Sequence, residues 1–316
     1  MLPKLNRRKF FRNTGLSAAG LAMSGFVGGA YKNHEAGENA PEQYDCMREL
    51  MKYRKIDAHV HIGFRPGDTE LLLDFADRLG IEKLCISRPV TNFSGNEPEG
   101  PDVVRRFNDL IIQAVRQHPE RFIGFLTLNP RYPAEAMTEL ERCVDAGLSG
   151  YKGYTQVKIN DPLYFPIIER FIELKMVMLM HAFCQLGIGG YRPKYDTGKD
   201  PHTSIPEDFV DVARRYPEAV FQFAHIGGGG DWEHECKVLA PVPNVYVDTS
   251  GSNNEEHMVE FAVRHLGEDR LLFGTDNSYY QGVGKILSAN LSETQKKKIF
   301  FDNFNNLLKR VGKHVD

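Results

Sequence analysis

The sequence lacks the features of three common classes of protein. Its 316 residues include five cysteines, an odd number, and no Cys-x-x-Cys pair, so we expect mostly buried free thiols. The net charge is only −3 and no basic patch rich in aromatic residues occurs, so composition gives no support for nucleic-acid binding. No Gly-rich dinucleotide fingerprint follows the first expected strand, which counts against a Rossmann domain.

Glycines 227–230 form a run that does follow an expected strand. The run lacks the Lys-Ser/Thr pair that completes a phosphate-binding loop. Glycine allows a backbone to approach other groups closely because it has no side chain. We therefore expect this run to pass close to a functional site.

The first thirty residues differ from the remainder in charge. They carry five basic residues and no acidic one, and without them the net charge changes from −3 to −8. A mildly apolar stretch, too short and Gly-rich to span a bilayer well, follows and ends in small residues, the order of a secretory signal. The pair Arg7-Arg8 resembles the twin-arginine signal, which predicts export of a folded protein; a basic arm is the alternative. The sequence thus divides into a signal peptide at 1–30, a linker at 31–52 and one domain at 53–316.

Short apolar runs alternate with longer amphipathic stretches after residue 53, which predicts parallel βα units. Closed barrels and open doubly wound sheets both contain such units, but eight strands in about 250 residues favour a TIM barrel. The expected helices lie between the expected strands, at Thr69–Leu79, Asp102–Gln117, Ala134–Ala146, Tyr164–Leu174, Pro206–Tyr216, Asp231–Leu239 and Glu255–Leu266, and a last helix runs from Ser292 to Leu308. Those strands are Lys55–His61, Lys83–Ser87, Phe122–Leu128, Gly150–Gly153, Val177–His181, Val220–His225, Val245–Asp248 and Leu271–Asp276.

Asp57, His59 and His61 alternate along the first expected strand. Because side chains of a strand alternate between its faces, all three point to the same side. A single strand histidine is more often a hydrogen-bonded core residue. Two imidazoles in alternation at a strand end can reach the same ion, so this pair predicts a metal site.

Three further polar residues each close an apolar run: His181, His225 and Asp276. Taken singly, each could instead cap a helix or form a structural hydrogen bond. In a barrel, however, the carboxyl ends of the strands converge at one mouth. Four histidines and one aspartate would then share a small space. Such nitrogen and oxygen ligands suit Zn²⁺, with one position left open for water.

Four segments resemble motifs of the amidohydrolase superfamily. Residues 57–63 resemble its D-x-H-x-H-x-G opening, and 223–229 the A-H-x-G-G-G segment of one branch. Residues 272–276 are similar to its F-G-[ST]-D segment, and 298–304 to its C-terminal K-I-x-x-x-N helix. That branch includes aminocarboxymuconate-semialdehyde decarboxylase, related aromatic-acid decarboxylases and many hydrolases. The resemblance covers about residues 54–311.

The resemblance implies an α/β fold, a distorted TIM (β/α)₈ barrel, with one divalent metal that is usually zinc. It implies His59, His61, His181 and Asp276 as metal ligands. His225 is implied to be a catalytic acid/base without a metal bond, and Asp276 to accept a proton as well as bind the metal.

Two cations are candidates for substrate binding. Lys152 stands where superfamily members with two metals carry a modified bridging lysine. It is usually no bridge in this branch, so we expect a strand-end contact or a buried ion pair. Arg88 follows the second strand and could hold a carboxylate through its planar fork; Arg65 and Arg192 are rivals, and each could be only a surface charge. The loops around 91–101 and 182–204 are long enough to be lids.

We consider three hypotheses for function. The first is a hydrolase that uses a metal-activated water on a small amide, ester or lactone. The second is a metal-dependent, non-oxidative decarboxylase of an unsaturated or aromatic acid. Arg88 beside the metal would favour decarboxylation, whereas export favours hydrolysis, since the named decarboxylases work inside cells. The third is a non-catalytic binding protein, which would have no need of His225.

The expected partner is a small-molecule substrate, with no nucleic acid. Contact with a membrane is expected only through the signal segment during export to the periplasm. The sequence allows a homodimer but does not specify one.

Overall fold

The computed structural model describes residues 45–316 except 92–99, 184–201, 227, 229–230 and 252. The expected signal peptide, most of the expected linker, Arg192 and most of both expected lid loops therefore lie outside the described residues. Helix α2, Cys46–Met51, lies within the range expected as linker. Among the described residues, no helix is both long enough and apolar enough to cross a membrane.

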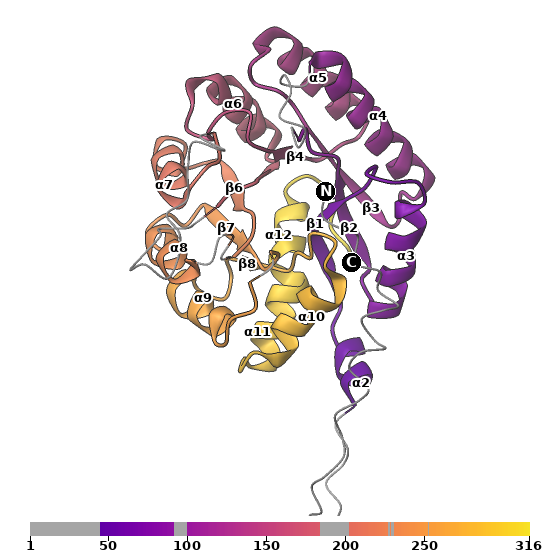
Figure 1. The fold of residues 1–316 in the computed structure, drawn as a ribbon, viewed down its shortest axis with the longest axis vertical. Coiled ribbons are helices and arrows are strands. Elements are labelled where there is room, and N and C mark those ends of the chain that lie inside the picture. Colours follow the sequence, from indigo (N-terminus) through magenta and orange to yellow (C-terminus); the bar gives the residue numbers. More distant parts are fainter. Residues whose placement is uncertain (1–44, 92–99, 184–201, 227, 229–230, 252) are drawn as a thin grey trace, which may run out of the picture. The chain divides into compact units, whose positions relative to one another are not determined.

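Eight parallel strands form a single sheet in chain order (Figure 1). Between β1 and the segment after β8, the amide of Ala58 donates to the carbonyl of Phe273 and that of Asp276 to the carbonyl of His59, each at 2.8 Å. These bonds bring the sheet nearly to closure, which confirms the expected barrel. The strands are β1 Ile56–His61, β2 Lys83–Ser87, β3 Phe122–Leu126, β4 Gly150–Gly153, β5 Val177–Met180, β6 Val220–Phe223, β7 Val245–Asp248 and β8 Leu271–Leu272.

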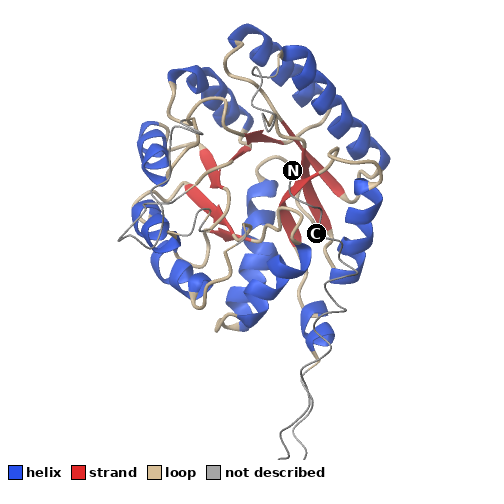
Figure 2. Cartoon of the chain, in the orientation of Figure 1, coloured by secondary structure: helices blue, strands red, loops and turns tan. Residues whose placement is uncertain are grey.

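Helices surround the strands (Figure 2). Those that connect consecutive strands lie where the sequence predicts them, within about two residues at most ends. They are α3 Asp68–Leu79, α4 Pro101–Gln117, α5 Pro133–Asp145, the short η1 Pro162–Tyr164, α6 Phe165–Leu174, α7 Pro206–Arg215, α8 Trp232–Leu239 and α9 Met258–Leu266. Four more follow β8: α10 Tyr279–Ser288, α11 Glu293–Lys297, the π-helical η2 Lys298–Asp302 and α12 Asn303–Lys309.

Side chains alternate between the outside and the inside of the barrel. In β5, Met178 and Met180 pack with the helices, whereas Val177 and Leu179 belong to the inner cluster that includes Phe304 of α12. That cluster also takes in the first residues of other strands, so α12 covers their amino ends. The carboxyl ends are the mouth that remains for a site.

Four strands end earlier than the sequence predicts, and β3 stops at Leu126 instead of Leu128. β5, β6 and β8 stop at Met180, Phe223 and Leu272, so His181, His225 and Asp276 lie just beyond them. His225 and Asp276 have φ values of 71° and 47°, in the left-handed region that a strand cannot continue through. Such backbone costs about 1–3 kcal/mol per residue and is concentrated at functional sites.

The described cysteines confirm the expected free thiols. The four described cysteines form no disulfide with one another; Cys85, Cys143 and Cys236 are buried, and Cys46 is exposed. Burial raises the pKa of the Cys143 thiol well above its usual value, so this thiol stays protonated and chemically inert. Cys143 therefore does not compete with the histidines as a metal ligand.

Candidate metal centre

His59, His61 and Asp276 meet at the mouth of the barrel. The Nε2 atoms of His59 and His61 lie 3.1 Å apart, which confirms that these alternate residues of β1 share a face. Oδ1 of Asp276 lies 3.2 Å from Nε2 of His61 and 3.7 Å from Nε2 of His59. Two imidazole nitrogens and a carboxylate oxygen thus converge on one small space.

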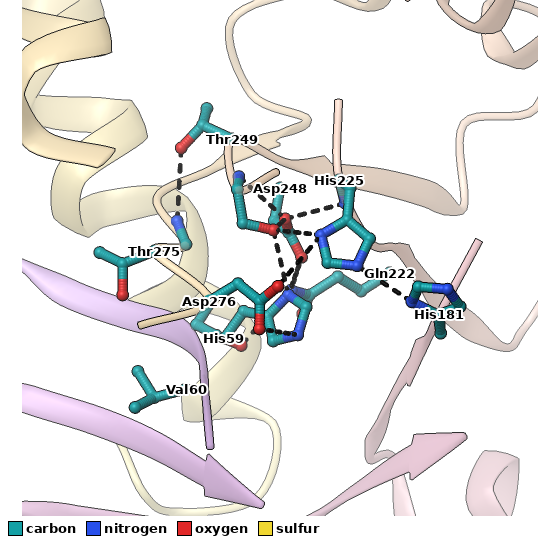
Figure 3. Close-up of polar contacts among 12 residues, drawn as sticks. His59, Val60, His181, Gln222, His225, Asp248, Thr249, Thr275 and Asp276 are labelled. Atoms are coloured by element: carbon teal, nitrogen blue, oxygen red, sulfur yellow. Dashed lines mark hydrogen bonds and ion pairs between the residues drawn. The ribbon is translucent and has the colours of Figure 1, made fainter. Parts of the chain in front are cut away.

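His181 and His225 adjoin this group (Figure 3). Nδ1 of His181 lies 3.1 Å from Nε2 of His225. Ligand atoms of His59, His225 and Asp276 all lie within 4.8 Å of one another, which makes them a candidate metal triplet among the described residues. The structure therefore gathers all five residues expected at the site, but this triplet contains His225 where the sequence predicts His181.

The donor set fits a divalent cation. Nδ1 of His59 contacts the carboxylate of Asp248 at 3.0 Å, and Nδ1 of His61 contacts Oγ of Ser87 at 2.9 Å. When each Nδ1 holds the ring proton for these oxygens, both Nε2 atoms carry lone pairs. Two lone pairs at 3.1 Å repel each other unless positive charge lies beside them; the amine of Lys152, 3.1 Å from Nε2 of His59, relieves part of this repulsion, and a divalent cation would relieve more of it. Imidazole nitrogens with a carboxylate suit zinc and other transition metals.

The polar groups of the site are strongly perturbed by burial. Burial lowers the pKa of His59, His61 and His181, and it lowers that of His225 to about 4. Burial alone would raise the pKa of Asp276, but the adjacent imidazoles of His59 and His61 hold it well below its usual range. At neutral pH the site therefore offers neutral imidazoles and an ionised carboxylate, the protonation states that bind metals.

These shifts predict how the stability of the metal-free protein depends on pH. A histidine whose folded pKa lies below 6.5 binds fewer protons in the native than in the unfolded state. The free energy of unfolding should therefore fall as the pH drops from 7, and His225 alone should account for about 2 kcal/mol at pH 5. Urea unfolding of chelator-treated protein at pH 7 and pH 5 measures this loss. His225→Asn should show a smaller loss, and equal stability at both pH values in the wild type would contradict the burial of neutral imidazoles.

Lys152 lies inside the barrel beside His59. The side chain is fully buried, and its Nζ lies 3.1 Å from Nε2 of His59. Burial lowers the pKa of Lys152 to about 8. The lysine therefore lies next to the candidate ligands, and it is not among the described residues that line the cavity at the barrel mouth.

Arg88 is held behind the wall of that cavity. A cavity of about 310 Å³ opens at the barrel mouth. The described residues that line it are His61, Phe64, Pro89, Thr91, Tyr154, His181, His225, Asp276 and Asn277. The Arg88 guanidinium stacks 3.8 Å from the centroid of the Phe64 ring. It donates to the carbonyls of Gly63 at 3.3 Å and Pro89 at 3.0 Å. The structure thus places Arg88 one layer away from the candidate ligands.

Several residues at the site were not expected from the sequence. Asp248 ends β7 and contacts His59, Ser250 contacts both His59 and His225, and the ring of Tyr154 stacks on His181 at 4.4 Å. The amide of Asn277 pairs with both backbone groups of His61, each at 2.8 Å. Only Asp248 had a recognisable signal, since it closes an apolar run just as His181 does.

The nearly closed barrel and the His/Asp cluster at its mouth together define a metal-dependent barrel enzyme of the TIM type. Residues 56–304 match the family model described as amidohydrolase, and the chain belongs to this family. The superfamily resemblance of the sequence motifs is thereby confirmed.

The curated relatives include several decarboxylases. Gamma-resorcylate decarboxylase of Rhizobium radiobacter is 34% identical over 313 residues, which covers 79% of this chain and 94% of that protein. The 2-amino-3-carboxymuconate-6-semialdehyde decarboxylase of Dictyostelium discoideum is 28% identical over 247 residues, with 70% and 68% covered. These relatives contradict the first hypothesis, hydrolysis, and agree with the alternative, decarboxylation.

Solved structures share the fold. A 2,6-dihydroxybenzoate decarboxylase in complex with 2,6-dihydroxybenzoate has a TM-score of 0.64 at 20% identity and covers 82% of this chain and 100% of its own. A dihydroxybenzoic acid decarboxylase of Polaromonas, with bound manganese and the inhibitor 2-nitroresorcinol, has a TM-score of 0.62 at 21% identity and covers 81% and 97%. At these identities the likeness supports the barrel fold itself.

Proposed function

We propose that this protein is a metal-dependent decarboxylase that releases CO₂ from an aromatic or unsaturated acid. The observation that carries the proposal is the 34% identity to a gamma-resorcylate decarboxylase along 94% of that relative. The cavity above the candidate ligands supports it, since Phe64, Pro89 and Tyr154 provide apolar walls suited to a flat ring.

The proposed ligands of one divalent metal are His59, His61, His181 and Asp276. The imidazole-rich set suits Zn²⁺, and the Polaromonas structure shows that a barrel of this fold also holds manganese. A bound divalent ion would polarise substrate oxygens as a Lewis acid. The protein's own residues would orient the acid, exclude water and move the proton.

Decarboxylation requires one proton for each CO₂ released. The bond between the substrate carbon and its carboxylate breaks, the electron pair stays on that carbon, and a proton replaces the CO₂. His225 is neutral in the free site, because burial lowers its pKa to about 4, so it can accept a proton from solvent water and then deliver that proton to the carbon. Asp276 is the second proposed proton acceptor at the mouth, although the imidazoles of His59 and His61 hold its pKa well below the usual range and make it a weaker base than His225.

The proposed role of Lys152 and Arg88 is electrostatic. Neither side chain lines the cavity that the described residues form, yet Lys152 Nζ lies 3.1 Å from His59 and Arg88 lies directly behind Phe64. Fixed positive charge beside an apolar cavity favours binding of an anionic acid over a neutral molecule.

A panel of substrates tests the proposal. Metal-loaded protein should release CO₂ from 2,6-dihydroxybenzoate, another hydroxybenzoate or an unsaturated amino-carboxy acid, and chelator-treated protein should release none. Matched amides, esters and lactones of similar size serve as controls and should remain intact. If none of the acids loses CO₂ under conditions where the metal is bound, the proposal is wrong.

A further inference from the structure

Asp248 is a fully buried carboxylate that accepts hydrogen bonds at both oxygens (Figure 3). Its Oδ1 accepts from the backbone amides of His225 and Ser250, each at 3.1 Å. Its Oδ2 accepts from Nε2 of Gln222 at 2.9 Å, and that amide nitrogen also faces the carbonyl of Ala58 at 3.4 Å. Amide protons are fixed on their nitrogens, so these contacts identify Asp248 as an acceptor. Its neighbours must donate to it.

The contact with Asp248 fixes the proton of His59. Nδ1 of His59 lies 3.0 Å from Oδ2 of Asp248, so this nitrogen carries the proton and donates it. The other nitrogen, Nε2, then carries a lone pair. That lone pair is on the atom 3.1 Å from Nε2 of His61, where the metal is proposed to bind.

Ser250 extends the same constraint to His225. The Ser250 hydroxyl lies 2.5 Å from Oδ1 of Asp248, so its single proton is donated to the carboxylate. The same hydroxyl oxygen lies 2.9 Å from Nδ1 of His225, so the imidazole must be the donor in this second hydrogen bond. His225 consequently holds its proton on Nδ1 and a lone pair on Nε2.

The constraint continues from His225 to His181. Nε2 of His225 has only a lone pair, so Nδ1 of His181, 3.1 Å away, must donate to it. His181 then keeps the lone pair of Nε2 for a metal. His225 has no such nitrogen left, because Nδ1 donates to Ser250 and Nε2 accepts from His181. Among the described hydrogen bonds, His181 thus keeps one imidazole nitrogen without a bond while both nitrogens of His225 are engaged, which favours His181 as the proposed ligand although His225 belongs to the compact triplet.

We propose that Asp248 is a positioning residue that sets the ring tautomers of His59, His225 and, through His225, His181. Ser250 connects Asp248 to His225. The arrangement leaves lone pairs on Nε2 of His59 and of His181 for the metal, and it makes Nε2, which accepts from His181, the unprotonated nitrogen of His225. The effect on turnover rests on the proposed decarboxylation, whereas the tautomers and the metal affinity do not depend on the reaction.

The variant Asp248→Asn should reverse the tautomer of His59. The side-chain oxygen of the introduced asparagine would still accept hydrogen bonds from the backbone amides of His225 and Ser250. Its NH₂ group would then face Nδ1 of His59. Gln222 can turn its amide to match, because its Oε1 has no partner among the described residues. His59 would then hold its proton on Nε2, where it blocks the metal. We expect metal affinity to fall about 10–100-fold, the usual effect of losing a carboxylate that orients a ligand.

Imidazole nitrogen NMR of metal-free protein labelled with ¹⁵N-histidine measures the tautomers directly, and titration with Zn²⁺ measures the affinity. Wild type should show His59 and His225 protonated on Nδ1, and Asp248→Asn should move the His59 proton to Nε2. Ser250→Ala should keep the His59 tautomer and bind Zn²⁺ within about threefold of wild type. It should lose the single tautomer of His225 and lower kcat more than it changes KM.

Asp57→Asn is the matched control. Asp57 is also a fully buried carboxylate of the barrel, and it accepts from the amides of His59 and Thr275 and from the Thr275 hydroxyl. It contacts no imidazole in these bonds, so this variant should keep the tautomers of wild type even if it loses stability.

A wild-type His59 protonated on Nε2 would overturn the proposal, as would an Asp248→Asn protein with unchanged tautomers and Zn²⁺ affinity. If Asp248→Asn fails to fold, Ser250→Ala still tests the proposal. An unaltered His225 tautomer in Ser250→Ala would also overturn the proposal. Expected tautomers and affinities without CO₂ release would refute decarboxylation and leave the role of Asp248 intact.

Discussion

His59→Ala should remove the metal and nearly all activity. His59 is fully buried at the centre of the site, with one nitrogen directed to Asp248 and the other toward His61 and Asp276. Loss of this imidazole leaves too few ligands to hold the ion, and a divalent metal contributes several kcal/mol to such reactions. We therefore expect metal content to fall from about one ion per chain to less than a tenth, and kcat/KM to fall by at least about 10³.

Elemental analysis of protein purified without chelators, with kinetics on the same samples, measures both losses. His314→Ala is the matched control, because His314 is exposed beyond α12 and far along the chain from any strand of the barrel. It should keep full metal content and full activity. A native protein that is fully active without metal, or a His59→Ala protein that retains its ion, would contradict the metal site.

His225→Asn should separate metal binding from chemistry. The hydrogen bonds of His225 to Ser250 and His181 engage both of its nitrogens, so this residue is not needed to hold the ion. Activity should fall by about 10²–10⁴, the usual contribution of a positioned acid/base, while the metal stays bound. His181→Asn should instead lose metal and activity together.

The same two measurements distinguish the assignments. If His225→Asn loses the ion and His181→Asn retains it, the two histidines have the opposite roles, as the compact triplet of His59, His225 and Asp276 would suggest. If both variants keep the metal and full activity, the reaction does not take place at this mouth of the barrel.

The sequence predicts the parts of the site that follow from local periodicity. Alternation along β1 places His59 and His61 on one face, and polar residues after apolar runs locate His181, His225 and Asp276 at the mouth. The alternation of side chains along a strand is a local property of the backbone, and a barrel brings the carboxyl ends of its strands to one mouth. These two rules are enough to place the five residues together.

Other parts depend on contacts that local rules do not contain. Asp248 had the same signal as His181, but its importance comes from His59, 189 residues away in the chain. Helix α10 was not predicted, because Gly282 and Gly284 lower its helix propensity. The structure shows why a glycine is needed there: a Cβ at Gly282 would lie 2.9 Å from the side chain of Thr275, next to Asp276.

The type of reaction could not be decided from the site residues. Hydrolysis and decarboxylation use the same metal ligands and the same acid/base, so the motif residues fit both equally. The expected discriminator, Arg88, stacks on Phe64 and is not among the described residues that line the cavity. The similarity to decarboxylases over most of the chain favours one reaction over the other.

The most direct test uses the acid that the metal-loaded protein converts fastest, labelled with ¹³C in its carboxylate and supplied in D₂O. We predict one ¹³CO₂ per turnover and a product with one deuterium on the carbon that carried the carboxylate, with neither formed by His59→Ala. Turnover in which the labelled carboxylate stays on the product, or ¹³CO₂ release that persists without metal, would contradict a metal-dependent decarboxylase.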